Sequence, residues 1–170
     1  MLVEQDPLSV FARAMLIHHL NINGRYDDAA REVQAALDIE NHWLVHYVMA
    51  ESLSVRGIFA EAAVEAEQAC RLAPWHSRTL GVLAGTLTRL GRGDEGKKIL
   101  TGLDKDAPFG MVLYHLVAGD MDAAAAWYAK SIEEREPFAV MYSPWPIVRA
   151  LRESHRWPAL AKMMNLPETV

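Results

Sequence analysis

The chain has 170 residues, of which 51% are hydrophobic and 23% charged, a composition typical of folded soluble domains rather than disordered segments. Its formal net charge of -5 argues against nucleic-acid binding, because proteins that hold phosphates carry clustered Lys and Arg in excess. Uncharged runs such as 107–119 are too short to cross a bilayer, and residues 1–7 lack the basic start of a signal peptide, so we expect a cytoplasmic protein without a membrane partner.

The single cysteine, Cys70, excludes an internal disulfide and suits a reducing compartment. It lies in a helical pattern, where a buried, inert thiol is far more common than a reactive one, so we predict a buried, unreactive thiol. Helix-forming sequence begins within a few residues of the start of the chain. We therefore expect a piece of a longer protein, with Met1 added for expression.

Four turn sequences of similar character punctuate the chain, at residues 23–30, 56–63, 90–97 and 118–125. Their glycines lie at 24, 57, 91 and 119, which gives spacings of 33, 34 and 28 residues. The first two spacings are typical of repeats built from a helix, a turn and a second helix. The shorter third spacing predicts a truncated first helix in the fourth repeat.

Each position of the turn has a physical role. The glycine ends a helix, because it adopts the left-handed conformation of a C-terminal cap. Acidic residues in the first turn of the next helix interact favourably with the positive end of its dipole. Apolar residues can fill the corner between the two helices, and small residues let the helices approach closely. These sets are Asp27, Glu61, Asp94 and Asp120; Tyr26, Phe59 and Met121; and Ala29, Ala62 and Ala124. Gly93 and Gly96 replace the corner residue and the small residue in the third turn, which predicts the loosest hairpin there.

The fold class that follows is all-α: a right-handed superhelical stack of about four helical hairpins, an α-solenoid. No stretch shows the alternation that predicts strands, and we expect prolines at the starts of first helices: Pro7, Pro74 and Pro108. The predicted repeat domain covers 1–136, with hairpins at 8–40, 41–74, 75–104 and 107–136. Residues 137–170, cut by four prolines, predict a C-terminal cap with short helices near 145–152 and 157–164.

The sequence resembles the tetratricopeptide repeat (TPR) family over residues 8–135. The likeness is strongest at Ala50, Leu53, Gly57, Phe59, Ala62, Ala69, Leu72 and Pro74. The tail from Ser154 to Pro167 is similar to the ends of larger bacterial signalling proteins, in which a TPR array follows a kinase, a nucleotide cyclase or a winged-helix regulator. The resemblance implies a protein-binding scaffold attached to such an effector.

Metal binding and catalysis find little support in the residues. His42 and His46, four apart on one helical face, could contribute to a zinc site with a carboxylate, but no His-Glu-x-x-His motif or cysteine pair accompanies them. The sequence has no Gly-x-Ser-x-Gly motif and no glycine-rich phosphate loop after a strand. We therefore expect no metal, no cofactor and no enzymatic activity.

The outward face of the first helices is the better candidate site, because stacked hairpins line a concave groove with these residues. The repeat register assigns eight side chains to this predicted groove: His18, Asn21, Tyr47, Glu51, Ser54, Arg78, Arg89 and Leu113. The Lys and Asn set with which some TPR arrays hold a peptide carboxylate is absent from these positions. Tyr47 with Arg78 and Arg89 could instead hold an acidic or aromatic stretch.

Two functions from different classes stay open. The first is a module that binds a protein or peptide, and the second is an element that self-associates. Self-association would use the N-terminal edge helix, with Val10, Phe11, Met15 and Ile22, to form a homodimer. Trp43 and Trp75, near a junction of hairpins, are further candidates for exposed apolar contact.

Overall fold

The chain is all-helical. A computed structural model describes residues 3, 6–101, 103 and 107–166, and about 75% of the chain is helical with no strand in this described part. Met1, the end of the third predicted hairpin at 104 and the last residues of the predicted cap, 167–170, lie outside it. Among the described helices, none is long and apolar enough to span a membrane. The chain divides into two compact units, Met1–Trp75 and His76–Val170.

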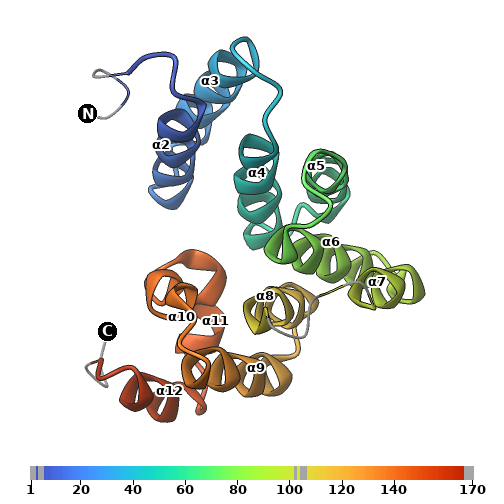
Figure 1. Cartoon of the computed structure of the whole chain (residues 1–170), viewed down its shortest axis with the longest axis vertical. Coiled ribbons are helices and arrows are strands. Elements are labelled where there is room, and N and C mark those ends of the chain that lie inside the picture. The colour runs from blue at the N-terminus through green and yellow to red at the C-terminus, as the bar shows by residue number, and fades with distance from the viewer. Residues whose placement is uncertain (1–2, 4–5, 102, 104–106, 167–170) are drawn as a thin grey trace. The chain divides into compact units, whose positions relative to one another are not determined.

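Unit 1 consists of two antiparallel helix pairs (Figure 1). Helix α2 (Val10–Ile22) pairs with α3 (Tyr26–Leu37), and α4 (Trp43–Val55) pairs with α5 (Phe59–Leu72). Helix α2 also packs directly against α4. Both pairs join through short turns, as expected for helices that bury their apolar faces against their neighbours in sequence.

Unit 2 begins with two further pairs and ends in short helices (Figure 1). Helix α6 (Ser77–Arg89) pairs with α7 (Gly93–Leu100), and α8 (Pro108–Ala118) pairs with α9 (Met121–Glu133). Helix α6 also packs extensively against α8. The C-terminal elements α10 (Pro137–Tyr142), α11 (Arg149–Arg152) and α12 (Trp157–Met163) each contact α9, and the 3-10 helix η1 (Pro146–Val148) contacts α8 and α11.

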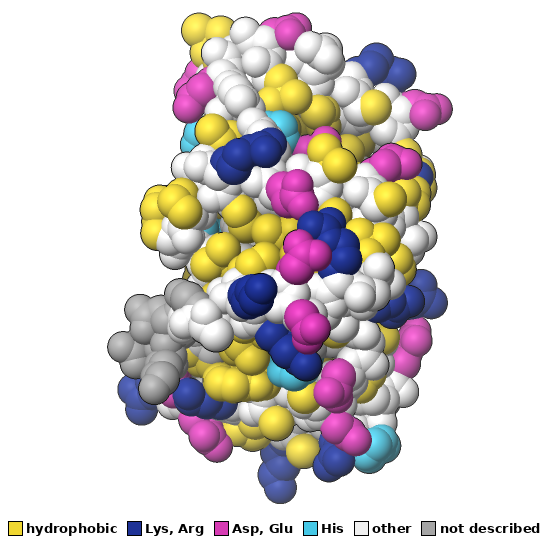
Figure 2. Space-filling view, turned by 90° about the vertical axis from the view of Figure 1, so that its right-hand side faces the viewer, with side chains coloured by type: hydrophobic (Ala, Val, Ile, Leu, Met, Phe, Trp, Pro, Cys, Tyr) yellow, Lys and Arg dark blue, Asp and Glu magenta, His cyan; other side chains and the backbone are white. Residues whose placement is uncertain are grey.

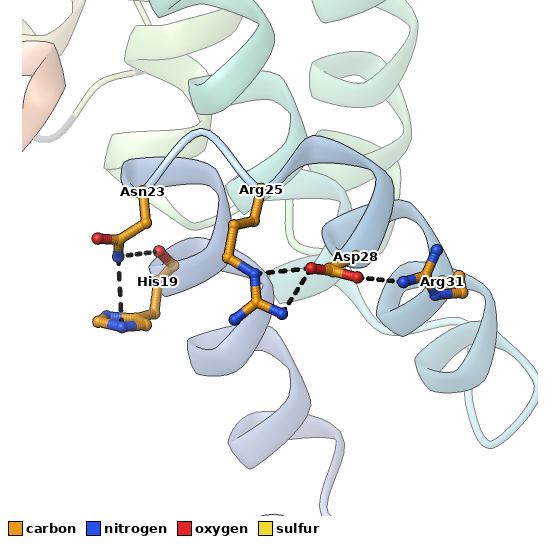
Figure 3. A network of polar contacts seen from close by, with 5 residues as sticks. All are labelled: His19, Asn23, Arg25, Asp28 and Arg31. Carbon is orange, nitrogen blue, oxygen red and sulfur yellow. Dashed lines mark hydrogen bonds and ion pairs between the residues drawn. The ribbon is translucent and has the colours of Figure 1, made fainter.

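The predicted glycine turns are confirmed. Gly24, Gly57, Gly91 and Gly119 all have positive φ, from 71° to 91°. After the first of these turns, exposed polar contacts link residues at the start of α3. Arg25 Nε donates to Asp28 at 2.7 Å, and Arg31 pairs with the same carboxylate (Figure 3). The Arg25 hydrogen bond is the main reason that the pKa of Asp28 is lowered.

Helix starts agree with the sequence only in part. Pro108 occupies the first turn of α8 as predicted, but Pro7 and Pro74 lie outside α2 and α6. Asp120 caps α9, accepting from the Ala123 amide at 3.0 Å, and so precedes the first turn in which it was expected. Two caps are histidines that the sequence analysis did not identify: His42 accepts from Leu44 N at 3.2 Å, and His76 accepts from Thr79 N at 3.3 Å.

The corner alanines are buried as predicted, with Ala29, Ala62 and Ala124 at most 1% exposed. The expectation of a loose third hairpin is wrong at Gly96. A Cβ at this glycine would lie 2.7 Å from the Ala84 carbonyl oxygen, so α7 approaches the α6 backbone closely. The missing side chain thus permits a tight contact rather than leaving a gap.

The C-terminal segment forms more helix than predicted, because its prolines begin helices rather than break them. Pro137 and Pro146 occupy the first turns of α10 and η1, where a missing N–H costs no hydrogen bond. Their helices cover an aromatic core in which the Tyr142 ring lies 4.9 Å from Phe109 and 3.9 Å from Trp145, between centroids.

Candidate binding surfaces

In unit 1 the predicted groove residues lie on two helices that pack together, α2 and α4. His18 is 9% exposed, and Tyr47, Glu51 and Ser54 are 2%, 2% and 7% exposed. Asn21, near the end of α2, is half-buried. Helical periodicity placed these side chains on one face, but it did not indicate how much of that face is covered, and their role in a groove stays a prediction.

In unit 2 the three predicted groove residues have different environments. Leu113 on α8 is fully buried, whereas Arg89 at the end of α6 is exposed. Arg78 Nη1 donates to the Tyr142 hydroxyl at 2.9 Å, and the guanidinium carbon lies 3.9 Å from the centroid of the Phe138 ring. Arg78 therefore holds α10 against the start of α6, and of these three residues only Arg89 is exposed at the surface.

Burial makes His18 a neutral side chain. Desolvation, followed by the nearby charge of His19, lowers the pKa of His18 to about 4. In the unfolded chain a histidine titrates near 6.5, so at pH values between 4 and 6.5 the unfolded chain binds more protons than the folded one. The fold therefore loses stability through His18 as the pH falls from 6.5 toward 4, and above pH 6.5, where both states are neutral, this loss is absent.

We therefore expect acidification to destabilise the protein partly through His18. At pH 5 its contribution should be lower by about 2 kcal/mol than at pH 7, and a His18→Gln variant should lack this part of the pH dependence. Urea unfolding of both proteins at pH 7 and pH 5 measures the difference. His155→Gln, at an exposed histidine of unit 2, is the matched control. Equal pH dependence in wild type and His18→Gln would contradict the prediction.

His46 connects three segments of unit 1. Its Nδ1 lies 2.7 Å from Glu65 Oε2 on α5, and its Nε2 lies 2.7 Å from Asn41 Oδ1 in the loop before α4. Both contacts have the length of hydrogen bonds, so His46 links α4 to α5 and to the loop before α4. His42 uses its ring to cap α4, so these two histidines have separate structural contacts rather than a common ligand. No group of three or more potential metal ligands is gathered in the described part of the chain.

A pocket of about 340 Å³ opens in unit 1 between its two hairpins. We call it the hairpin pocket; its lining residues come from all four helices and are Asn21, Tyr26, Ala30, Met49, Leu53, Arg56, Glu61, Val64 and Glu65. The Arg56 guanidinium lies 4.1 Å from the centroid of the Tyr26 ring. The sequence analysis placed Tyr26 as a corner residue, but its side chain is 41% exposed and forms a wall of this pocket.

One sequence signal could have identified the hairpin pocket. Glu61 and Glu65 stand four apart on α5, and like charges at this spacing destabilise an isolated helix. A repulsive pair that persists on a helix surface indicates some compensating contact. Only Asn21 of the eight predicted groove residues belongs to the hairpin pocket.

A second, shallower pocket of about 580 Å³ lies in unit 2 beside the turn between α8 and α9. An ion pair at its edge joins two elements, since Arg156 Nε donates to Asp122 at 2.8 Å. This hydrogen bond is the main cause of the lowered pKa of Asp122. Arg156 thus pairs with one of the two aspartates that line this pocket, and the other, Asp120, caps α9.

Cys70 on α5 is half-buried. Burial, and then the charge of Glu67, raises the pKa of its thiol to about 12, so almost none of it is thiolate near neutral pH.

We expect iodoacetamide at pH 8 to alkylate Cys70 at least ~100-fold more slowly in the folded protein than in urea, where the thiol titrates near 8.5. Mass spectrometry of timed samples measures both rates. Similar rates in the two conditions would contradict the burial of this thiol.

On the face presented in Figure 2, acidic and basic side chains are interspersed among hydrophobic ones rather than separated by sign. Such a surface gives little long-range attraction for a polyanion. The candidates for ligand contact are therefore two local features, the hairpin pocket and the exposed Arg89 side chain. Comparison with known proteins finds no matching family model and no matching curated protein.

Proposed function

We propose that this chain is a protein–protein interaction module of the TPR type, acting as the binding part of a larger bacterial signalling protein. The observation that carries the proposal is the run of antiparallel helix pairs joined at left-handed glycines. The first three of these glycines follow one another at spacings of 33 and 34 residues. Helix pairs of this kind bury one face against their neighbours and leave the other available to a partner. The resemblance in sequence supports the same family.

The ligand in this proposal is a peptide segment that contacts the exposed end of α6. Arg89 supplies a cation there, so the segment should carry an acidic or aromatic residue. Most apolar side chains of the neighbouring α8 are buried, but Met111, Tyr114 and Ala118 are half-buried and offer apolar surface to a ligand. Apolar contact with a few placed polar groups is typical of peptide-binding grooves.

Selection from a random peptide library displayed on phage tests the proposal. We expect enriched peptides that bind with micromolar Kd and shift the amide signals around Arg89 in heteronuclear NMR spectra. Arg89→Ala should weaken binding about fivefold to tenfold, as expected for loss of one charged contact, whereas Arg149→Ala, an exposed arginine elsewhere in unit 2, should not. Failure to enrich any peptide over an albumin control would contradict the function, and an unaffected Arg89→Ala would contradict the groove.

A second candidate function is self-association through α2. Phe11 and Ile22 are 61% and 41% exposed, and with the half-buried Met15 they follow one face of α2; Leu8, in the turn before the helix, is 74% exposed. Val10, which was expected on this face, is instead 8% exposed and belongs to the core. The one formally charged side chain of α2, Arg13, pairs with Glu32 at 2.6 Å, so two copies of α2 would not repel each other.

Sedimentation velocity separates the two functions. Self-association predicts a dimer at a concentration of ~100 µM that Phe11→Glu returns to monomer, because a charge would then be buried in the contact. A wild-type monomer at that concentration would exclude the homodimer for this chain.

A further inference from the structure

The hairpin pocket combines an apolar floor with two carboxylates. Leu53, 6% exposed, and Met49 form the floor, and Val64 beside them is 63% exposed. Glu61 and Glu65 rise from α5 one helical turn apart at the same rim. An apolar floor below paired acceptors suits a long side chain with an aliphatic stem and a charged end.

The two carboxylates keep capacity for a cation. Glu65 offers Oε2 to His46 at 2.7 Å, which leaves its second oxygen, and Glu61 is exposed. Within residues 6–101, 103 and 107–166, no Lys or Arg lies within 4.0 Å of either carboxylate. Several other acidic residues of this surface, such as Asp28 and Glu32, do pair with arginines. A bound cation would also relieve the repulsion between Glu61 and Glu65.

Two more side chains indicate what the pocket accepts. Arg56 already covers the Tyr26 ring at 4.1 Å and gives that wall a positive charge, so an incoming guanidinium must lie on the opposite side of the pocket, at Glu61 and Glu65. Asn21 has a buried amide nitrogen without an acceptor among the described residues. A buried donor left without a partner is unfavourable, and a main-chain carbonyl of a bound peptide is a suitable acceptor for it.

We propose that the hairpin pocket binds an arginine side chain presented by a partner protein, with the guanidinium between Glu61 and Glu65, the stem on Met49 and Leu53, and the adjoining main-chain carbonyl toward Asn21. The inference rests on the proposed function, because its occupant belongs to a bound protein. It adds a second contact to the module, at the turn end of unit 1. The contact has a defined chemistry. The partner contributes one arginine, and the rest of the partner's surface complements this acidic chain.

The probe is an arginine blocked at both ends, N-acetyl-arginine N-methylamide, titrated into the whole chain and followed by heteronuclear NMR. We expect the side-chain amide signals of Asn21 and the backbone signals of Glu61 and Glu65 to shift with a Kd of about 1 mM, as fits so small a ligand. The citrulline analogue, which has the same shape without the charge, should bind at least ~10-fold more weakly.

Glu61→Gln is the discriminating variant, since this exposed side chain is not part of the core and its loss should not disturb folding. We expect it to weaken the arginine probe about fivefold, and the exposed Glu40→Gln in the same unit to leave the affinity unchanged. Equal binding of arginine and citrulline, an unaffected Glu61→Gln, or no shift up to ~20 mM probe would each overturn the proposal. If library peptides still bound in an Arg89-dependent way, the interaction module would stand and the arginine pocket alone would fall.

Discussion

Replacing Gly81 with alanine should destabilise the protein by about 3 kcal/mol, more than a surface substitution of the same size could. A Cβ at this position would lie 2.0 Å from the Gly110 carbonyl oxygen and 2.9 Å from its carbonyl carbon. Both are backbone atoms, which cannot move aside as the end of a flexible side chain can. The α6 and α8 helices must therefore separate, with loss of packing along their whole contact.

Thermal unfolding followed by circular dichroism measures this effect, and we expect the midpoint to fall by roughly 10 °C in a chain of this length. Gly93→Ala is the matched control. Its added Cβ meets no atom within 4 Å, and alanine is a better helix former than glycine, so this variant should be as stable as wild type or slightly more stable. A Gly81→Ala protein with wild-type stability would show that α6 and α8 are farther apart than the structure places them.

The close contact between α6 and α8 is a part of the fold that could not be predicted from the sequence. The turn glycines were predictable, because a left-handed cap at a regular spacing has a local signature. Gly81, Gly85 and Gly110 lie inside helices, where glycine is unfavourable and signals only some unspecified packing reason. Their partner atoms belong to another helix, Gly110 O for Gly81 and Tyr114 O for Gly85, so the reason became visible only with the two helices in place.

The candidate site residues, too, could be predicted from the sequence only in part. Helical periodicity assigned Glu51 and Leu113 to an outward face, but burial depends on what covers that face, and these side chains are 2% and 0% exposed. Arg78 was expected to meet a ligand, and its neighbours Phe138 and Tyr142 come from a segment about 60 residues later in the sequence. Contacts over such separations have no signature in a single sequence. The walls of the hairpin pocket come from four helices, and the only local sign of it is the spacing of Glu61 and Glu65.

Tyr128 is the second position at which we expect a large effect, because it joins the last hairpin to the C-terminal helices. Its ring is fully buried on α9, edge-on to Phe109 at 5.8 Å and to Trp157 of α12 at 6.1 Å, between centroids. Its hydroxyl donates to the Ala139 carbonyl of α10. Burial raises the pKa of this phenol above its usual range, so it remains a donor at all physiological pH values.

Tyr128→Ala should therefore cost about 4 kcal/mol, the amount typical of removing a buried aromatic side chain, and Tyr128→Phe only ~1 kcal/mol, for the lost hydrogen bond. Urea unfolding measures both values. Tyr26→Phe, at an exposed tyrosine of unit 1, should change stability by less than ~0.5 kcal/mol. A Tyr128→Phe loss as large as that of Tyr128→Ala would assign the whole effect to the hydroxyl and contradict the packing argument.

Hydrogen exchange locates the damage. If Tyr128 is what holds the short C-terminal helices on α9, its removal should speed exchange in α10 and α12, while the amides of α4 in unit 1 keep their protection. Helices of six and seven residues are too short to be stable alone, so their persistence depends on such buried contacts. Unchanged protection in α10 and α12 in the Tyr128→Ala protein would mean that other contacts, such as Arg78 with Tyr142, suffice to hold this segment.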